Sequence, residues 1–97
     1  MTKYSRLEVL NRLKRLSEWR LEGEEIKKDY GFRSFSEAMK FVNQVADFAE
    51  HLRHHPAILV DNQRVTLTLS THEQGGITES DFNLAEQVER RLMDQRR

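Results

Sequence analysis

The sequence of 97 residues contains no cysteine. This absence excludes disulfide bonds, thiolate nucleophiles and metal sites built on cysteine, and it fits a reducing compartment. Proline occurs once and glycine four times, and there is no internal repeat, low-complexity stretch or linker. The length predicts one domain, residues 1–97, with a modest core that removes about two thirds of the unfolded surface from water.

The chain has no excess of charge of either sign, because 16 Lys and Arg balance 16 Asp and Glu. Proteins that bind nucleic acids usually carry a basic stripe or patch, whereas basic residues and glutamates are interleaved here. A small basic end is interpreted as favourable charge at a helix C-terminus and consists of Arg90, Arg91, Arg96 and Arg97. We therefore expect no nucleic-acid partner.

Long apolar runs are also missing. No stretch reaches the length of a membrane span, and the N-terminus lacks the apolar segment of a secretory signal. We therefore expect no membrane partner and a cytoplasmic location.

Three segments carry the start signals of helices, in which a Ser or Thr precedes an acidic residue by three positions. This spacing is typical of a capping box, in which each residue bonds to the backbone amide of the other. The pairs are Ser5 with Glu8, Ser34 with Glu37, and Thr78 with Asp81. The third pair is the weaker match because it has Asp in place of Glu or Gln.

Apolar spacing predicts what each helix buries. The first helix is expected from about Arg6 to Leu16, with Leu7, Leu10 and Leu13 on one side. The central helix has the clearest stripe, which comprises Ala38, Phe41, Val42, Val45, Ala49 and Leu52. The last helix begins after Thr78 and places on one face Phe82, Ala85, Val88 and Leu92.

Between these helices the apolar period changes to two, which indicates strands. Trp19 and Leu21 alternate with polar residues before a turn at Glu22-Gly23, and a second strand then has one face made of Ile26, Lys28, Tyr30 and Phe32. Ala57 to Val60 and Arg64 to Thr71 form another pair around Asp61-Asn62-Gln63. In its second strand Val65, Leu67 and Leu69 point one way and Thr66, Thr68 and Ser70 the other.

The predicted order is therefore α-β-β-α-β-β-α. Because hairpins pair antiparallel, we expect an α+β fold with a four-stranded antiparallel sheet and three helices packed on one face.

Histidines are concentrated where elements end. His51, His54 and His55 close the central helix, and Pro56 should end that helix before His55. His72 is expected to continue the polar face of the last strand, ahead of the turn signal Gly75-Gly76. Two elements could thus bring imidazoles together, and an unperturbed pKa of about 6.5 suits imidazole to proton transfer.

Simpler interpretations compete with a catalytic one. His51 is best explained as a surface residue near the helix C-terminus, and helix capping and catalysis are equally plausible for His54 and His55 taken alone. His72 taken alone is best explained as an exposed loop histidine. Asp81 is explained by its place at a helix start, and Glu50 as a solvated helix residue. His51 and His55 also have the i, i+4 spacing of a helical metal pair, with His72 or Glu50 as third ligand. Pro56 argues against that pair, so we expect no metal.

Two segments resemble a known family. Residues 50–56, EHLRHHP, are similar to the E-x-x-x-H-H-P signature of pterin-4a-carbinolamine dehydratases, and residues 70–81, STHEQGGITESD, resemble the family's T-H-x-x-G-G-L-T-x-x-D stretch. The separation of the two blocks fits as well. Phe32-Arg33-Ser34-Phe35 is similar to the family's entry into the central helix, and the likeness extends roughly from Trp19 to Leu92.

The resemblance implies an enzyme, a lyase that dehydrates 4a-hydroxytetrahydropterin to quinonoid dihydropterin in tetrahydrobiopterin recycling. It implies the same fold, no cofactor, and a homodimer or homotetramer, with an aromatic amino-acid hydroxylase as a further partner. The residue roles it implies are these: His54, His55 and His72 catalytic, Asp81 and Glu50 supporting the site, and Pro56, Ser70 and Thr71 binding the pterin.

The chain departs from the family pattern in places. Asn62 stands where many members have an aromatic residue, Ala57 stands where many have an acidic one, and the stretch from Trp19 to Ile26 is shorter than in animal members. A non-catalytic, dehydratase-like binding or assembly protein is therefore the second hypothesis, and a histidine-dependent metal-binding domain is the third.

Overall fold

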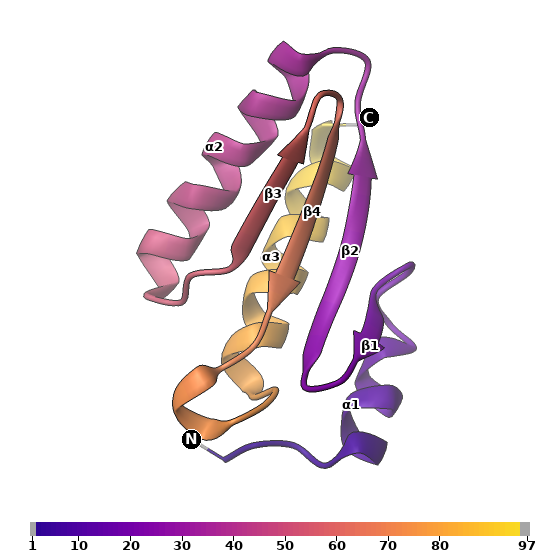
Figure 1. Cartoon of the computed structure of the whole chain (residues 1–97), viewed down its shortest axis with the longest axis vertical. Coiled ribbons are helices and arrows are strands. Elements are labelled where there is room, and N and C mark those ends of the chain that lie inside the picture. Colours follow the sequence, from indigo (N-terminus) through magenta and orange to yellow (C-terminus); the bar gives the residue numbers. More distant parts are fainter. Residues whose placement is uncertain (1, 96–97) are drawn as a thin grey trace.

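A computed structural model describes residues 2–95. In chain order these residues form α1 (Arg6–Leu13), β1 (Arg20–Glu22), β2 (Glu25–Gly31), α2 (Phe35–Leu52), β3 (Ala57–Asp61), β4 (Arg64–Leu69), the short 3-10 turn η1 (His72–Gln74) and α3 (Glu79–Gln95). The predicted α+β class and element order are confirmed (Figure 1).

The strands form one antiparallel sheet in the order β1-β2-β4-β3. Both predicted hairpins are present, and the central strands β2 and β4 join them in a register that pairs Ile26 with Leu69 and Tyr30 with Val65. Because side chains alternate along a strand, these apolar residues share one face, which α2 and α3 cover (Figure 1). The opposite face remains accessible to solvent and carries polar residues such as Asp29.

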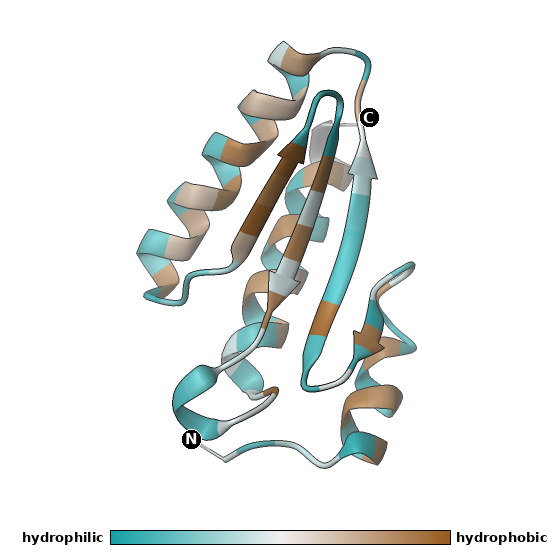
Figure 2. Cartoon of the chain, viewed as in Figure 1, coloured by the Kyte–Doolittle hydropathy of each residue, from teal (hydrophilic) through white to brown (hydrophobic). Residues whose placement is uncertain are grey.

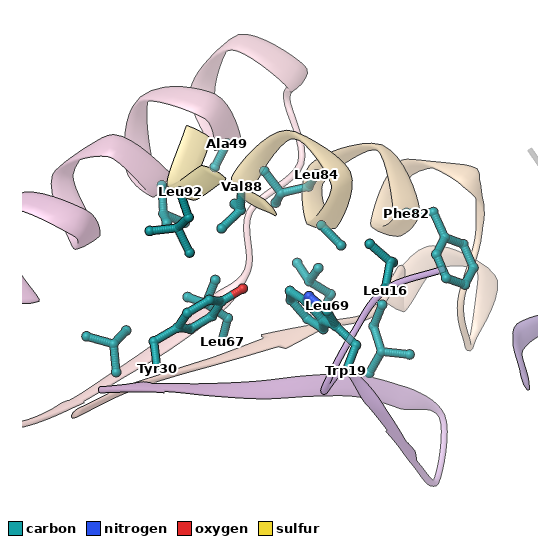
Figure 3. Close-up of a cluster of buried hydrophobic side chains, with 14 of the residues drawn as sticks. Leu16, Trp19, Tyr30, Ala49, Leu67, Leu69, Phe82, Leu84, Val88 and Leu92 are labelled. Atoms are coloured by element: carbon teal, nitrogen blue, oxygen red, sulfur yellow. The ribbon is translucent and has the colours of Figure 1, made fainter. Parts of the chain in front are cut away.

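The core lies between the sheet and the two long helices. Figure 3 shows Trp19 and Tyr30 on the sheet side of the core and Leu84 and Val88 on α3 opposite them. The predicted stripes of α2 and α3 are largely confirmed, since the buried residues include Ala38, Phe41, Val45, Ala49, Phe82, Ala85, Val88 and Leu92. Apolar and polar residues alternate along these helices in the hydropathy view (Figure 2). None of the helices formed by residues 2–95 is both long and apolar enough to cross a membrane.

α1 differs from its prediction in length and in the face it buries. The helix ends at Leu13 rather than at Leu16, which is buried in the turn that follows. Leu7 is 79% exposed and Leu10 is 40% exposed, whereas Val9 is buried. Leu13 is partly buried and packs against the core, so the leucine periodicity was right for one of its three residues and missed Val9.

Two smaller expectations about helix ends are also corrected. Leu52, assigned to the core stripe of the central helix, is 38% exposed because it occupies the last position of α2. Arg90 and Arg91 lie in α3 ahead of the last turn that the structure describes, so among the described residues no arginine occupies that turn. Arg96 and Arg97 lie outside the described residues.

A charged cluster attaches α1 to the start of α3. Arg12 donates to both carboxylate oxygens of Glu79 at 3.0 and 3.1 Å, and the Tyr4 hydroxyl donates to the same carboxylate at 2.5 Å. The hydrogen bonds from Arg12 and Tyr4 lower the pKa of Glu79 from 4.5 to about 2. The bond to Glu79 in turn raises the pKa of Tyr4.

A second charged cluster lies at the edge of the core. Lys28 belongs to the helix-facing side of β2, and its ammonium donates to the Ser17 carbonyl at 3.0 Å and to the Glu89 carboxylate at 2.9 Å. The same carboxylate accepts from Trp19 Nε1 at 3.1 Å and from the Tyr30 hydroxyl at 2.6 Å. Lys28 is therefore paired, although the sequence pattern alone indicated only that it shares a face with apolar residues.

Candidate active site

The segments that carry the predicted site residues come together at one end of the sheet, where α2 ends, β4 ends and α3 begins (Figure 1). The link from α2 into β3 carries His54 and His55. The link from β4 into α3 carries His72 in η1, and Asp81 lies in the first turn of α3. Residues from distant parts of the sequence thereby share one region.

The end of α2 determines where the two histidines lie. Arg53 caps the helix in the left-handed conformation, with φ 56° and ψ 40°. The reversal brings the His54 amide to the Ala49 carbonyl at 3.0 Å, which satisfies one of the free carbonyls at the helix end. The prediction that the helix ends before His55 is confirmed, and both histidines leave the helical face.

His54 faces a buried carboxylate. Its Nε2 lies 2.5 Å from Oδ1 of Asp81, whose side chain is 0% exposed, while the His54 side chain is 14% exposed. A carboxylate that is ionised can only accept hydrogen bonds, and with Asp81 in that form the contact requires a proton on Nε2 of His54. The lone pair of Nδ1 is then left for proton transfer, and the carboxylate can stabilise the imidazolium that results.

Asp81 is also a helix-start carboxylate, as the sequence predicted. Its Oδ2 accepts from the Thr78 amide at 2.9 Å, which is one half of a capping box. The other half differs, because the Thr78 hydroxyl accepts from the Ser80 amide at 3.3 Å rather than from Asp81. The helix start therefore buries and orients the group that bonds to His54.

His55 pairs with Glu50 at the surface. Its Nε2 is hydrogen-bonded to Glu50 Oε2, and the two side chains are 66% and 75% exposed. Solvent weakens such a pair, so Glu50 orients the His55 ring less firmly than Asp81 orients the His54 ring. His51 is exposed on α2, in agreement with its interpretation as a surface residue.

The position of His72 corrects one expectation. The polar face of the last strand does not continue to this residue, because β4 ends at Leu69 and His72 opens η1 as an exposed side chain. The turn is closed by the Thr71 amide, which donates to the Gly76 carbonyl at 2.8 Å. Gly75, at φ 72°, supplies the left-handed residue that ends η1.

The remaining predicted residues have defined neighbours. Pro56 is half-buried between His55 and β3. The Ser70 hydroxyl donates to the Glu24 carbonyl at 2.9 Å, next to the β1–β2 turn. The Thr71 hydroxyl donates to Oδ2 of Asp81 at 2.8 Å.

The sequence analysis did not include Thr78 among the site residues. It is fully buried, and its hydroxyl lies 2.8 Å from that of Thr71. The Thr-x-x-Asp spacing predicted Thr78 as a helix cap. The same spacing could have indicated that Thr78 lies next to Asp81 in the site.

A metal centre is not formed by the candidate ligands. His55 lies beyond the end of α2, so it does not share a helical face with His51. Within residues 2–95 no group of three or more His, Asp or Glu side chains is arranged to hold a metal ion.

Comparisons with known proteins identify a family for the chain. The family model described as Pterin 4 alpha carbinolamine dehydratase matches residues 2–91. A protein of Thermomicrobium roseum, provisionally named a pterin-4-alpha-carbinolamine dehydratase, is 45% identical over 82% of this chain and 86% of its own length. One from a Roseiflexus species with the same provisional name is 43% identical over 91% of this chain and 95% of its own length.

Solved structures show the same fold. A crystal structure described as a transcriptional coactivator/pterin dehydratase from Brucella melitensis matches with a TM-score of 0.86 and 34% identity, over 91% of this chain and 96% of that one. A pterin dehydratase-like protein described as a RuBisCO assembly factor in the alpha-carboxysome matches with a TM-score of 0.58 and 22% identity, over 72% of this chain and 81% of that one. The second likeness concerns the fold alone. On the family match and these identities, the chain belongs to the pterin 4 alpha carbinolamine dehydratase family.

Proposed function

We propose that the protein dehydrates a 4a-hydroxytetrahydropterin to quinonoid dihydropterin and water, as a step in tetrahydrobiopterin recycling. In this reaction the bond between C4a and the hydroxyl oxygen breaks, and the hydroxyl leaves as water after receiving a proton. The neighbouring ring nitrogen loses its proton, and the electron pair of that N–H bond forms the new C=N bond. The reaction is redox-neutral, so its balance requires only proton donors and acceptors.

The observation that carries the proposal is the hydrogen bond between His54 and the buried Asp81 at 2.5 Å. A carboxylate behind an imidazole fixes its tautomer and stabilises its protonated form, which suits general acid and base catalysis. Family membership supports the same chemistry. His55, supported by Glu50, and His72 would complete the proton transfers. Substrate would come from an aromatic amino-acid hydroxylase that uses a pterin.

Pro56 and Ser70 flank the catalytic histidines in the sequence, and we assign them to the walls of the pterin site. Asn62, where many members have an aromatic residue, has φ 56° in the β3–β4 turn, a conformation that asparagine tolerates well. Each strand residue adds about 3.3 Å of length, and the whole of β3 separates Asn62 from His55. The departure therefore concerns the turn rather than the histidines of the same subunit.

The direct test is a dehydration assay that follows the loss of freshly generated 4a-hydroxytetrahydropterin. Its rate is compared with the spontaneous rate of dehydration. Acceleration that is proportional to protein concentration supports the proposal. A rate equal to the spontaneous one would favour a non-catalytic dehydratase-like binding or assembly role. The departures from the family pattern at Asn62 and Ala57 are the observation behind that alternative.

A further inference from the structure

A buried cluster of hydroxyl and carboxylate groups lies behind His54. It consists of Thr71, Thr78 and Asp81, which are 8%, 0% and 0% exposed. Thr71 comes from the link after β4, whereas the other two belong to the start of α3. The cluster therefore connects the segment that carries His72 with the carboxylate that bonds to His54.

The hydrogen bonds of Asp81 fix the orientation of its carboxylate. Oδ2 accepts from the Thr78 amide at 2.9 Å and from the Thr71 hydroxyl at 2.8 Å. An oxygen of a carboxylate has about two good acceptor positions, so both positions of Oδ2 are filled. Oδ1 is thereby directed toward His54 Nε2, at 2.5 Å.

The direction of each proton in the cluster follows from the carboxylate. Ionised Asp81 can only accept hydrogen bonds, so the Thr71 hydroxyl uses its single proton to donate a hydrogen bond to the Asp81 carboxylate. In the 2.8 Å contact between the two threonine hydroxyls, Thr71 is then the acceptor and Thr78 the donor. The Thr78 oxygen in turn accepts from the Ser80 amide at 3.3 Å. This series of hydrogen bonds runs from the α3 backbone to the Asp81 carboxylate, and each bond polarises the next.

The backbone of Thr71 also forms hydrogen bonds that hold the turn carrying His72. Its amide donates to the Gly76 carbonyl at 2.8 Å, and its carbonyl accepts from the Gly76 amide at 3.3 Å. These two bonds close the turn that carries His72. One residue thus fixes the base of that turn with its backbone and orients Asp81 with its side chain.

We propose that Thr71 is a positioning residue for the reaction and not a donor to the substrate. Its hydroxyl, oriented by Thr78, holds Asp81 so that His54 keeps its proton on Nε2 and its lone pair on Nδ1. The assignment of a catalytic effect rests on the proposed dehydratase function. The effect on the His54 ring does not, because it is a property of the protein without substrate.

The test compares Thr71→Val, which removes the hydroxyl at nearly constant shape, with Thr71→Ser, which keeps it. Long-range proton–nitrogen NMR spectra of the imidazoles report the tautomer, and the dehydration assay gives kcat and KM. We expect the wild type and Thr71→Ser to show the Nε2–H tautomer of His54, and Thr71→Val to show a mixture. We expect kcat of Thr71→Val to fall by about a hundred-fold, the order of loss seen when a reacting group is misplaced by about 1 Å, with KM unchanged.

Asp81→Asn provides the matched background. If Thr71 acts through Asp81, adding Thr71→Val to Asp81→Asn should lower kcat no further. A rise in KM at constant kcat in Thr71→Val would overturn the proposal, because it would indicate a direct substrate contact. A Thr71→Ser variant in which His54 no longer shows a single tautomer would also overturn the proposal. This result can be obtained even if Thr71→Val fails to fold. A wild type without dehydratase activity would remove the proposed function, while the NMR comparison would still decide whether Thr71 orients His54.

Discussion

At the scale of single residues, His51 and His54 lie close together in the sequence but in different environments. His54 contacts a buried carboxylate, whereas His51 is exposed on α2. Replacing His54 or His55 with Ala should lower the dehydration rate about a hundred- to ten-thousand-fold, the usual loss for a general acid or base. His72→Ala should also reduce the rate, by a smaller factor. Steady-state rates with 4a-hydroxytetrahydropterin measure these effects.

His51→Ala is the control for this series, because it removes an imidazole of the same helix end without touching the Asp81 contact. Far-UV circular dichroism should be unchanged in all the histidine variants, since these side chains lie at element ends. His54→Ala alone should also lower the melting temperature, because it leaves the buried Oδ1 of Asp81 without its partner. The site assignment is wrong if His51→Ala proves the most damaging variant, or if His54→Ala and His55→Ala retain wild-type rates.

The ion pair of Lys28 and Glu89 allows a prediction about stability. The Lys28 and Glu89 side chains are 10% and 22% exposed. Glu89→Ala leaves the ammonium of Lys28 without its counter-ion, with only the Ser17 carbonyl to accept from it, and removes the carboxylate that accepts from Trp19 Nε1. Breaking a buried pair in this way should lower the free energy of unfolding by about 3 kcal/mol. Urea unfolding followed by far-UV circular dichroism measures the change.

The matched comparison is the double variant Lys28→Met with Glu89→Leu. Because both charges are replaced by apolar groups, it should be less destabilised than Glu89→Ala. A double variant that is the less stable of the two would show that the pair itself, rather than the unpaired charge, carries the effect.

The sequence could predict only part of this chemistry. The Thr-x-x-Asp spacing placed Asp81 at a helix start, and Pro56 placed His54 and His55 beyond a helix end. The contact between Asp81 and His54 joins residues far apart in the chain, so local spacing contains no information about it. The family resemblance assigned Asp81 to the site, and only the folded geometry shows what it touches. The pairing of Lys28 with Glu89 was missed for the same reason.

At the scale of elements, the ion pair between α1 and α3 predicts how stability depends on pH. Folding lowers the pKa of Glu79 from 4.5 to about 2. A carboxyl whose pKa is lower in the folded state stabilises the fold above its unfolded pKa, and this contribution is lost as the pH falls toward the folded pKa. The loss should therefore occur between pH 4.5 and about pH 2. Its size should be modest, because the Glu79 side chain is 42% exposed and solvent screens the pair.

Glu79→Gln should lower stability near neutral pH and weaken the dependence of stability on pH in the acid range. Urea midpoints measured across that range test the expectation, and Glu73→Gln on the exposed turn η1 controls for the loss of one negative charge. A wild type and a Glu79→Gln variant with parallel acid profiles would contradict the assigned role of this pair.

The elements themselves were predicted where local physics determines them. The apolar stripes of α2 and α3 and the alternation in β4 identified most of the residues that these elements bury, although Leu52 is exposed and Leu84 was missed. α1 was mispredicted because the three leucines suggested an apolar side, whereas the folded chain buries Val9 and exposes Leu7. His72 was misplaced because strand alternation cannot indicate where pairing ends and a 3-10 turn begins.

At the scale of the whole molecule, the two edges of the sheet differ. The β1 edge is short, and its Arg20 pairs with Glu22 and Asp29, which protects it from pairing with another chain. The β3 edge is longer and carries Leu59, which is 64% exposed on the face that the helices leave open. An exposed apolar edge strand is a template for another strand. β3 is therefore the edge at which we expect a second copy to pair.

This geometry makes the predicted homodimer or homotetramer testable with one substitution. Leu59 is the middle residue of β3, so a twofold axis through its centre would place it opposite its own counterpart. The wild type should be oligomeric in light scattering at micromolar concentration. Leu59→Lys should halve the mass, because it places like charges opposite each other. Leu7→Lys, which changes an equally apolar and even more exposed residue on α1, should leave the mass unchanged. A monomeric wild type would contradict oligomerisation, and an unchanged mass in Leu59→Lys would place the contact at another surface.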